Sequence, residues 1–256
     1  MRATWWGHAS VTLELAGLRV LTDPVLTDRV AFLRRFGPTP PRSAASADVV
    51  IVSHLHGDHL HLPSLRLLPA RTRLIAPRGA ARLLADVHPG VEEVGPGDVI
   101  QVGAVQMTAV HAEHDDRRHP WSQHSGKALG FVFSTKGHSV WFAGDTGLFD
   151  EMAALGPIDT ALIPVGGWGP TLGPEHLDPD QAAEAVQRVG ARDAIPIHYG
   201  TLWPRGLRPL APALFRAKCR EPGARFATAL SGSGVRPHVL GLGQSVVIDE
   251  STEISP

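Results

Sequence analysis

The first half of the chain carries hydrophobic patterns that are typical of β-strands. Apolar and polar residues alternate over 11–15, and the turn Ala16-Gly17 joins this segment to 18–21, so the two segments predict a β-hairpin. The continuously apolar run 48–52 predicts a strand that is buried on both faces. Similar patterns predict a helix over 78–87 and three further strands, at 72–76, 99–102 and 104–110.

The second half combines more strands with one well-marked helix. Apolar runs predict strands at 128–134, 138–143, 159–164 and 193–197. Asp178 is a suitable N-cap, Pro179 a suitable first helical residue, and Gly190 a residue at which helices commonly end. Between them an apolar stripe recurs at helical spacing: Ala182, Ala183, Val186 and Val189.

Three long segments between these elements, 24–47, 111–127 and 165–177, are predicted to be loops. Long loops in compact domains tend to carry function. Two rounds of several strands followed by a helix predict an α/β fold, in which a sandwich of sheets is covered by helices. Because no linker or low-complexity tract divides the chain, residues 1–256 are predicted to form a single domain.

Composition narrows the classes of protein that fit this pattern. The 256 residues include 24 Lys and Arg and 25 Asp and Glu, and the resulting net charge of −1 disfavours nucleic acid as a partner. Hydrophobic residues make up 43% of the chain, which is enough for a packed core. The single cysteine, Cys219, excludes an internal disulfide. Since neither a signal peptide nor a transmembrane segment is recognisable, we expect a soluble, cytoplasmic protein.

Histidine is unusually abundant, and its distribution indicates a metal site. Eight of the 14 histidines fall in two clusters, one over 54–61 and the other over 111–124. The first cluster contains the hexapeptide His54-Leu55-His56-Gly57-Asp58-His59, directly after the predicted strand 48–52. Imidazoles two residues apart can converge on one cation, and the Asp-His pair that follows faces a second position nearby. A solvated loop explains this concentration of metal-ligand side chains poorly.

The hexapeptide has the form H-x-H-x-D-H, and here the chain resembles the metallo-β-lactamase superfamily. Two later motifs resemble the same superfamily: Ala143-Gly144-Asp145-Thr146-Gly147 and Pro196-Ile197-His198-Tyr199-Gly200. Three segments, Thr4–Ser10, Leu21–Pro24 and Glu175–Pro179, are similar to one of its branches. That branch includes N-acyl-phosphatidylethanolamine-hydrolysing phospholipase D and ascorbate-6-phosphate lactonase-like proteins. The resemblance covers about residues 3–210 and implies a four-layer αββα sandwich.

The resemblance also implies a set of metal ligands. These are His54 and His56 for a first metal, Asp58, His59 and His198 for a second metal, and Asp145 as a carboxylate that bridges the two. The remaining ligand of the first metal is either His111 or His114, since both follow the predicted strand 104–110. In the branch this strand ends at a proline, and the ligand follows three residues later. Val110-His111 occupies the place of that proline here, so alignment with the branch favours His114.

The implied chemistry is hydrolysis by a dinuclear metal site. Imidazole ligands favour two zinc ions, while the carboxylates leave manganese or iron open. A hydroxide shared by the metals would attack an ester-like bond, because paired cations lower the pKa of a bound water. Asp58 or Asp145 would orient this hydroxide, and His176 or a water would donate the final proton.

The resemblance to the phospholipase branch favours a phosphodiester as the substrate, in a small or lipid-like molecule. Lactone hydrolysis is the alternative within the same class. Two other classes are less favoured. A di-iron oxidoreductase would need an added flavin-binding domain, for which the chain has no segment, and the other class is a non-enzymatic module that binds metal or nucleic acid, for the latter of which the chain has no basic insertion. The oligomeric state stays open, a homo-oligomer included.

Several other residues either serve the site or have an ordinary structural role. His8 lies in a motif of the branch, and Asp23 either orients an imidazole or only caps the turn before Pro24. His176 either serves the reaction or is an ordinary loop residue. Some arginines and tryptophans could border the site or simply pack in loops: Arg34, Arg35, Arg117, Arg118, Arg205, Arg208, Trp121, Trp168 and Trp203. The histidines that have no motif around them are expected at the surface: His61, His88, His138 and His238.

Overall fold

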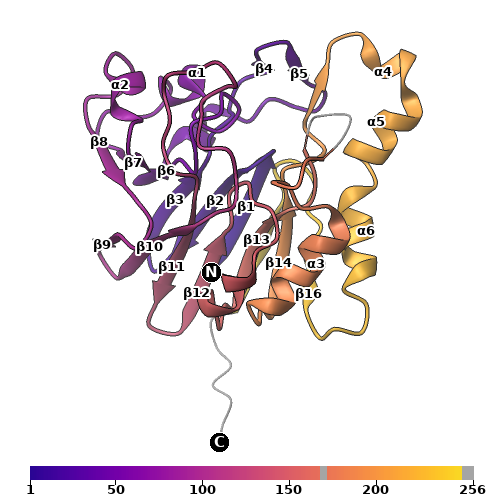
Figure 1. Cartoon of the computed structure of the whole chain (residues 1–256). Coiled ribbons are helices and arrows are strands. Elements are labelled where there is room, and N and C mark those ends of the chain that lie inside the picture. Colours follow the sequence, from indigo (N-terminus) through magenta and orange to yellow (C-terminus); the bar gives the residue numbers. More distant parts are fainter. Residues whose placement is uncertain (168–171, 250–256) are drawn as a thin grey trace, which may run out of the picture.

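The computed structural model describes residues 1–167 and 172–249, and in this part of the chain two seven-stranded sheets form a sandwich (Figure 1). The first sheet has the strand order β17 (Ser245–Val247), β1 (Arg2–Gly7), β2 (Ser10–Leu15), β3 (Leu18–Thr22), β6 (Val49–Ile51), β7 (Arg73–Pro77) and β8 (Val91–Val94). The second has the order β16 (Arg236–Pro237), β14 (Asp193–Ile197), β13 (Thr160–Pro164), β12 (His138–Phe142), β11 (Leu129–Thr135), β10 (Val105–His111) and β9 (Val99–Val102).

A small third sheet and several helices complete the described structure. The third sheet has the order β15 (Leu202–Pro204), β5 (Leu33–Arg35) and β4 (Arg29–Val30). The α-helices are α1 (Leu62–Leu65), α2 (Ala81–Leu84), α3 (Pro179–Arg188), α4 (Leu207–Leu210), α5 (Pro212–Cys219) and α6 (Pro222–Ala229). Two 3₁₀ helices are η1 (Arg42–Ala45) and η2 (Asp150–Leu155). None of the described helices has the length and apolar character needed to cross a membrane.

Both large sheets repeat one pattern, in which antiparallel strands continue into parallel strands. In the first sheet β1, β2 and β3 are antiparallel, and β3, β6, β7 and β8 are parallel. In the second sheet β9 to β12 are antiparallel, and β12, β13, β14 and β16 are parallel. Parallel strands present their carboxyl ends at the same edge, so the loops that follow them gather there.

The inner faces of the two sheets bury the main hydrophobic core. Phe131 and Phe133 of β11 and Phe142 of β12 are fully buried in one cluster with Leu13 of β2 and Ile51 of β6. These side chains come from strands of both sheets, so the cluster holds the two sheets together. Burial of apolar area of this kind is the main favourable contribution to folding.

Helices cover the outer faces of the sandwich. Val186 of α3 and Phe226 of α6 share a buried cluster with Trp141 of β12, on the second sheet. Leu65 of α1 and Leu84 of α2 share another with Leu74 of β7, on the first sheet (Figure 1). The layers are therefore helix, sheet, sheet and helix, and the predicted αββα sandwich is confirmed.

The strong local patterns located the corresponding elements. The predicted hairpin corresponds to β2 and β3, and the run 48–52 to β6. Helix α3 begins as expected, because the Asp178 side chain accepts hydrogen bonds from Asp180 N and Gln181 N in a capping box. That residues 1–256 form a single domain stays a prediction.

Two predictions about the first half were wrong, and strand β8 was not predicted. The segment 24–47 is not only loop but carries β4, β5 and η1. The helix predicted over 78–87 is reduced to the single turn α2, since Glu93 Oε1 accepts hydrogen bonds from Gly79 N and Ala81 N at 2.8 Å and holds the preceding chain in a turn. Strand β8 was missed because Glu92 and Glu93 interrupt its apolar pattern on an edge strand.

Candidate metal centre

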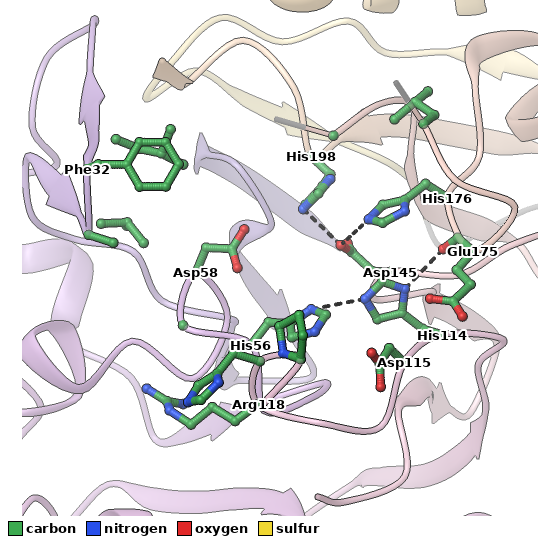
Figure 2. Close-up of a pocket in the computed structure, with 18 residues that line it drawn as sticks. Phe32, His56, Asp58, His114, Asp115, Arg118, Asp145, Glu175, His176 and His198 are labelled. Carbon is green, nitrogen blue, oxygen red and sulfur yellow. Dashed lines mark hydrogen bonds and ion pairs between the residues drawn. The ribbon is translucent and has the colours of Figure 1, made fainter. Parts of the chain in front are cut away.

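The side chains with metal-binding chemistry gather where strands of both sheets end. His54 follows β6 in the first sheet, Asp145 follows β12, and His198 follows β14 in the second. His114 comes from the segment after β10, and His59 from the turn that begins with His54. Figure 2 shows His56, Asp58, His114, Asp145 and His198 around one cavity.

The first group of donors consists of three imidazoles. His56 Nδ1 lies 3.0 Å from His54 Nε2 and 3.1 Å from His114 Nε2. His54 is fully buried. The donor atoms of these three residues lie close enough to one another to hold one cation.

The second group combines imidazoles with carboxylates. His59 Nε2 lies 3.1 Å from His198 Nε2, and the Oδ2 atom of Asp145 lies 3.1 Å from His198 Nε2 and 3.4 Å from His59 Nε2. Asp58 Oδ2 is 3.9 Å from His59 Nε2. A donor atom of Asp145 also lies close to one of His114, so this carboxylate is adjacent to both groups.

The motif that contains Asp145 brings the two halves of the molecule close together. Gly144 has a φ of +65°, and a Cβ atom there would lie 2.8 Å from Leu129 O and from the Ser53 side chain. Only glycine allows this approach without displacing its neighbours. The same segment holds the preceding loop, since Gly147 N donates to Glu113 O at 2.8 Å and Thr146 Oγ1 accepts from Glu113 N at 3.0 Å. His114 is thereby fixed beside Asp145.

Outer hydrogen bonds determine which nitrogen of each imidazole carries a proton. His114 Nδ1 lies 3.0 Å from Glu175 O and His198 Nδ1 lies 2.8 Å from Gly166 O. A carbonyl oxygen only accepts, so both Nδ1 atoms carry a proton and both Nε2 atoms turn a lone pair inward. His59 Nδ1 likewise donates to Asp23 Oδ2 at 2.6 Å. This is the usual way in which proteins orient metal-binding imidazoles.

A divalent cation fits these donors. The Nε2 atoms of His59 and His198 would repel each other at 3.1 Å unless a proton or a cation lies between them. Asp145 Oδ1 is buried and has no hydrogen-bond partner among the described residues. A buried, unpaired carboxylate oxygen is costly, and a cation would satisfy it. Imidazole and carboxylate together suit zinc, iron or manganese.

Asp23 connects one imidazole of each group. Its carboxylate is fully buried and accepts from Ser53 N at 2.7 Å and from Ser53 Oγ at 2.6 Å, in addition to His59 Nδ1. Since the Ser53 hydroxyl donates to Asp23, it accepts from His54 Nδ1, which lies 2.9 Å away. Asp23 therefore orients His59 directly and His54 through Ser53, in addition to any role as a cap of the turn before Pro24.

Backbone strain is concentrated at the same place. Asp23, His8 and His198 have φ values of +32°, +52° and +63°, a region that residues other than glycine rarely adopt. His198 N donates to His8 O at 2.9 Å, and His8 Nε2 lies 3.1 Å from Asp58 Oδ2. Strained residues of this kind persist where the surroundings hold them, often at functional sites. His8 thus supports both Asp58 and His198.

The charge states of these side chains bear on cation binding, and all but that of His59 favour it. Burial lowers the pKa of His198 to about 3 and that of His56 to about 4, so both imidazoles are neutral at pH 7. Burial works against ionisation of Asp145, but His198 and His59 outweigh it and hold its pKa well below the usual range. Burial also opposes protonation of His59, whereas Asp145, Asp23 and Asp58 raise its pKa well above the usual range. A proton on His59 therefore competes with a cation for Nε2.

The structure places the two candidates of the second histidine cluster differently. His114 is nearly buried beside His56, whereas His111 is exposed, at the end of β10, with its Nε2 atom 3.2 Å from Glu113 Oε2.

His176 lines the cavity, and its Nε2 atom lies 3.6 Å from Asp145 Oδ2 (Figure 2). Burial lowers the pKa of His176, so its imidazole is neutral at pH 7.

The expectation that isolated histidines lie at the surface was wrong for three of them. His61, His88 and His138 are buried. Each finds a polar partner: Ser64 Oγ at 2.8 Å for His61, Gly90 O at 2.7 Å for His88 and Thr160 Oγ1 at 3.1 Å for His138. His238 is partly exposed and binds Asp193 Oδ1 at 2.6 Å. Ser64 lies in α1, Gly90 in a loop and Thr160 on β13, and no motif in the sequence indicates these contacts.

Among the loop arginines and tryptophans, Arg118 is the one that borders the described cavity. Its Nη1 atom donates to Leu55 O at 2.7 Å and so fastens the segment 111–127 to the turn that carries His56. Arg35, the last residue of β5 in the small sheet, is buried, and Trp203 is buried against Phe215. The remaining candidates lie away from the cavity lining: Arg34, Arg117, Arg205, Arg208 and the exposed Trp121. Trp168 lies outside the described residues.

Comparisons with known proteins agree with this geometry. A family model described as the β-lactamase superfamily domain matches residues 18–199. A UPF0173 metal-dependent hydrolase of Pyrococcus furiosus is 32% identical over 212 residues, which cover 80% of this chain and 86% of that protein. The N-acyl-phosphatidylethanolamine-hydrolyzing phospholipase D 1 of Caenorhabditis elegans is 31% identical over 232 residues, which cover 80% of this chain and 65% of that protein.

A solved structure shows the same fold at lower sequence identity. A metallo hydrolase of Ignicoccus hospitalis superposes with a TM-score of 0.72 and 21% identity, over 97% of this chain and 98% of that chain. The extent of the family match and the identity to the archaeal relative determine the family. The chain belongs to the metallo-β-lactamase superfamily and is a metal-dependent hydrolase.

Proposed function

We propose that this hydrolase uses two divalent cations, preferably zinc, to cleave a phosphodiester bond in a small or lipid-like molecule. The observation that carries the proposal is that Asp145 lies beside two groups of inward-facing donors. The first cation would be held by His54, His56 and His114, the second by Asp58, His59 and His198, with Asp145 between them. When bound, such a pair lowers the pKa of a water towards neutrality and stabilises the charge that develops on phosphoryl oxygens.

The protein's own side chains would orient and protonate the reacting groups. The carboxylates of Asp58 and Asp145 point into the cavity and can accept a hydrogen bond from the attacking water (Figure 2). The His176 imidazole lies beside Asp145 and is neutral at pH 7, so it would first take up the proton released by the attacking water and then pass it to the departing oxygen. The 31% identity to a phospholipase D supports a phosphodiester over a lactone.

Substitution of each candidate ligand separates His114 from His111. We expect His114→Ala to remove the first cation, so that the metal content per chain falls by about half, because two imidazoles hold zinc much more weakly than a complete ligand set. His111→Ala should leave the content unchanged, since its side chain is exposed beside Glu113. Elemental analysis of the dialysed proteins measures both. A loss of metal in His111→Ala alone would reverse the assignment, and equal losses of metal in the two variants would contradict it.

The hydrogen bonds of Asp23 predict unequal effects on the two cations. Asp23→Asn should weaken both, by about 10–100-fold in affinity, whereas Ser53→Ala should weaken only the cation bound by His54. Cobalt titration followed by absorption would resolve the two binding steps. Ser134→Ala, on β11 and away from the site, is the control, and circular dichroism verifies the fold. Asp23→Asn with both affinities intact would show that the carboxylate only shapes the turn.

A comparison of substrates tests the proposed reaction. The zinc- or manganese-loaded protein should hydrolyse bis(4-nitrophenyl) phosphate. With a dialkyl phosphodiester, whose alkoxide needs a proton to depart, His176→Ala should lower kcat by about 10²–10⁴-fold while metal content stays constant; with bis(4-nitrophenyl) phosphate, whose 4-nitrophenolate departs without one, the loss should be much smaller. Release of 4-nitrophenol measures the rate with the latter substrate. A panel of lactones provides the alternative substrates. Turnover of lactones without any turnover of the phosphodiester would establish the lactonase instead.

A further inference from the structure

Residues 236–248 form a strap that joins the two large sheets on one side of the sandwich. Its first strand, β16, pairs with β14 in the second sheet, and its last strand, β17, pairs with β1 in the first. Both are edge strands, so the strap bridges the two sheets at their edges. Leu240 and Leu242, between these strands, pack against the main hydrophobic core. The strap is therefore part of the packed structure and not a loose extension of the chain.

A buried carboxylate fixes the first end of the strap. Asp193 accepts hydrogen bonds from Arg236 Nε at 3.0 Å and from Arg236 Nη2 at 2.7 Å, and its Oδ1 atom lies 2.6 Å from His238 Nε2. Burial works against ionisation of Asp193, but the hydrogen bonds from Arg236 and His238 outweigh it and lower its pKa. The carboxylate is therefore charged at pH 7, and its two-pronged bond to the guanidinium fixes both the position and the direction of β16.

The second half of the strap lies against the turn that carries His8. Gly243 N donates to Trp5 O at 2.7 Å, and Trp5 N donates to Gln244 O at 3.0 Å. The indole Nε1 atom of Trp5 donates in turn to His8 O at 2.9 Å. The same carbonyl accepts the hydrogen bond from His198 N. The strap is thus connected to the metal centre through Trp5 and His8.

The Leu242 side chain fills the space beside this turn. Gly7 has a φ of +105°, and a Cβ atom there would lie 2.8 Å from Leu242 Cδ2 and 2.8 Å from Thr201 Cγ2. Leu242 therefore occupies the room that Gly7 leaves by having no side chain. Thr201 Oγ1 accepts a hydrogen bond from His8 N at 2.6 Å. Leu242 thus packs beside the residue that precedes His8 and beside the residue that binds its amide.

His8 needs such support because its backbone is strained. A φ of +52° is unfavourable for histidine and persists only where neighbouring groups hold it. The Nε2 atom of His8 binds Asp58 and its carbonyl binds His198, so a relaxed turn would displace both. Among the described residues, no hydrogen bond links His8 to the three imidazoles of the first donor group. Relaxation of the turn would therefore act on the second group alone.

We infer that the strap, through Leu242, holds the strained turn of His8 and so keeps Asp58 and His198 in place for metal binding. Leu242 is not among the described residues that line the cavity, so it is a positioning residue. Removal of its side chain would leave a space beside Gly7 into which the turn can relax. The consequence for a second cation rests on the proposed function, whereas the support of the turn does not depend on it.

Amide hydrogen exchange tests the support of the turn. In the zinc-loaded protein, followed by nuclear magnetic resonance, Leu242→Ala should speed the exchange of the His8 and His198 amides by about tenfold or more, because the bonds that protect them open more often. Leu240→Ala is the matched control, since Leu240 is also a half-buried leucine of the strap that packs on the same core. It should lower the thermal midpoint by a similar amount and leave both amides unchanged. Leu242→Met, which conserves the volume, should restore slow exchange.

Cobalt titration followed by absorption measures the effect on the metal centre. Leu242→Ala should weaken the binding step of the second donor group by about tenfold and that of the first by less than about twofold. The step that His114→Ala abolishes identifies the first group. Leu240→Ala should change neither step. Leu242→Val, which shortens the side chain by one carbon, should show a smaller change in the same direction and serves if Leu242→Ala does not fold.

The outcomes separate this inference from the proposed function. Exchange of the His8 and His198 amides at equal rates in the Leu242 and Leu240 variants would overturn the inference, because Leu242 would then contribute only to the core. Equal weakening of both cobalt steps would overturn it as well. Faster exchange of the two amides, together with a single cobalt step even in the unchanged protein, would support the role of Leu242 and contradict the two-cation function.

Discussion

The arrangement of this molecule depends on buried nitrogen and oxygen lone pairs that point at one another. His59 and His198 turn their Nε2 atoms together at 3.1 Å while their Nδ1 atoms are fixed by Asp23 and Gly166. Asp145 adds a buried oxygen that has no partner among the described residues. Such an arrangement is unfavourable without a positive charge at its centre. A cation makes these groups mutually stabilising, and the site is therefore coupled to the stability of the fold.

The sandwich explains how donors so far apart in the sequence meet. Each sheet ends its parallel strands at the same edge, so His54 and Asp145 arrive from opposite sheets. Gly144 allows the two halves to approach, and the bonds from Gly147 and Thr146 to Glu113 set the position of His114. The strained backbone of Asp23, His8 and His198 has the same cause as this close approach, because three turns must place their side chains within one small volume.

The sequence predicted the parts of this arrangement that local chemistry determines. The H-x-H-x-D-H segment and the cap of α3 are short-range patterns. The structure shows the predicted cap, and it brings the side chains of the segment close together, whereas their binding of metal stays a prediction. The β4–β5 hairpin was missed because its strands are very short and β5 depends on pairing with the distant β15. His61, His88 and His138 were misjudged for a related reason, since tertiary packing determines the burial of an imidazole. The choice between His111 and His114 likewise depended on register. The hydrogen bond from Gly147 N to Glu113 O positions the chain so that His114 lies beside Asp145, and its role as a ligand stays a prediction.

The central claim is that the two donor groups bind two cations that share Asp145. X-ray diffraction from crystals grown with zinc, recorded at the zinc absorption edge, tests it most directly. The account predicts two anomalous peaks per chain, one beside His54, His56 and His114 and the other beside Asp58, His59 and His198, with the Asp145 carboxylate between them. A single peak within one group, or peaks away from these side chains, would contradict it.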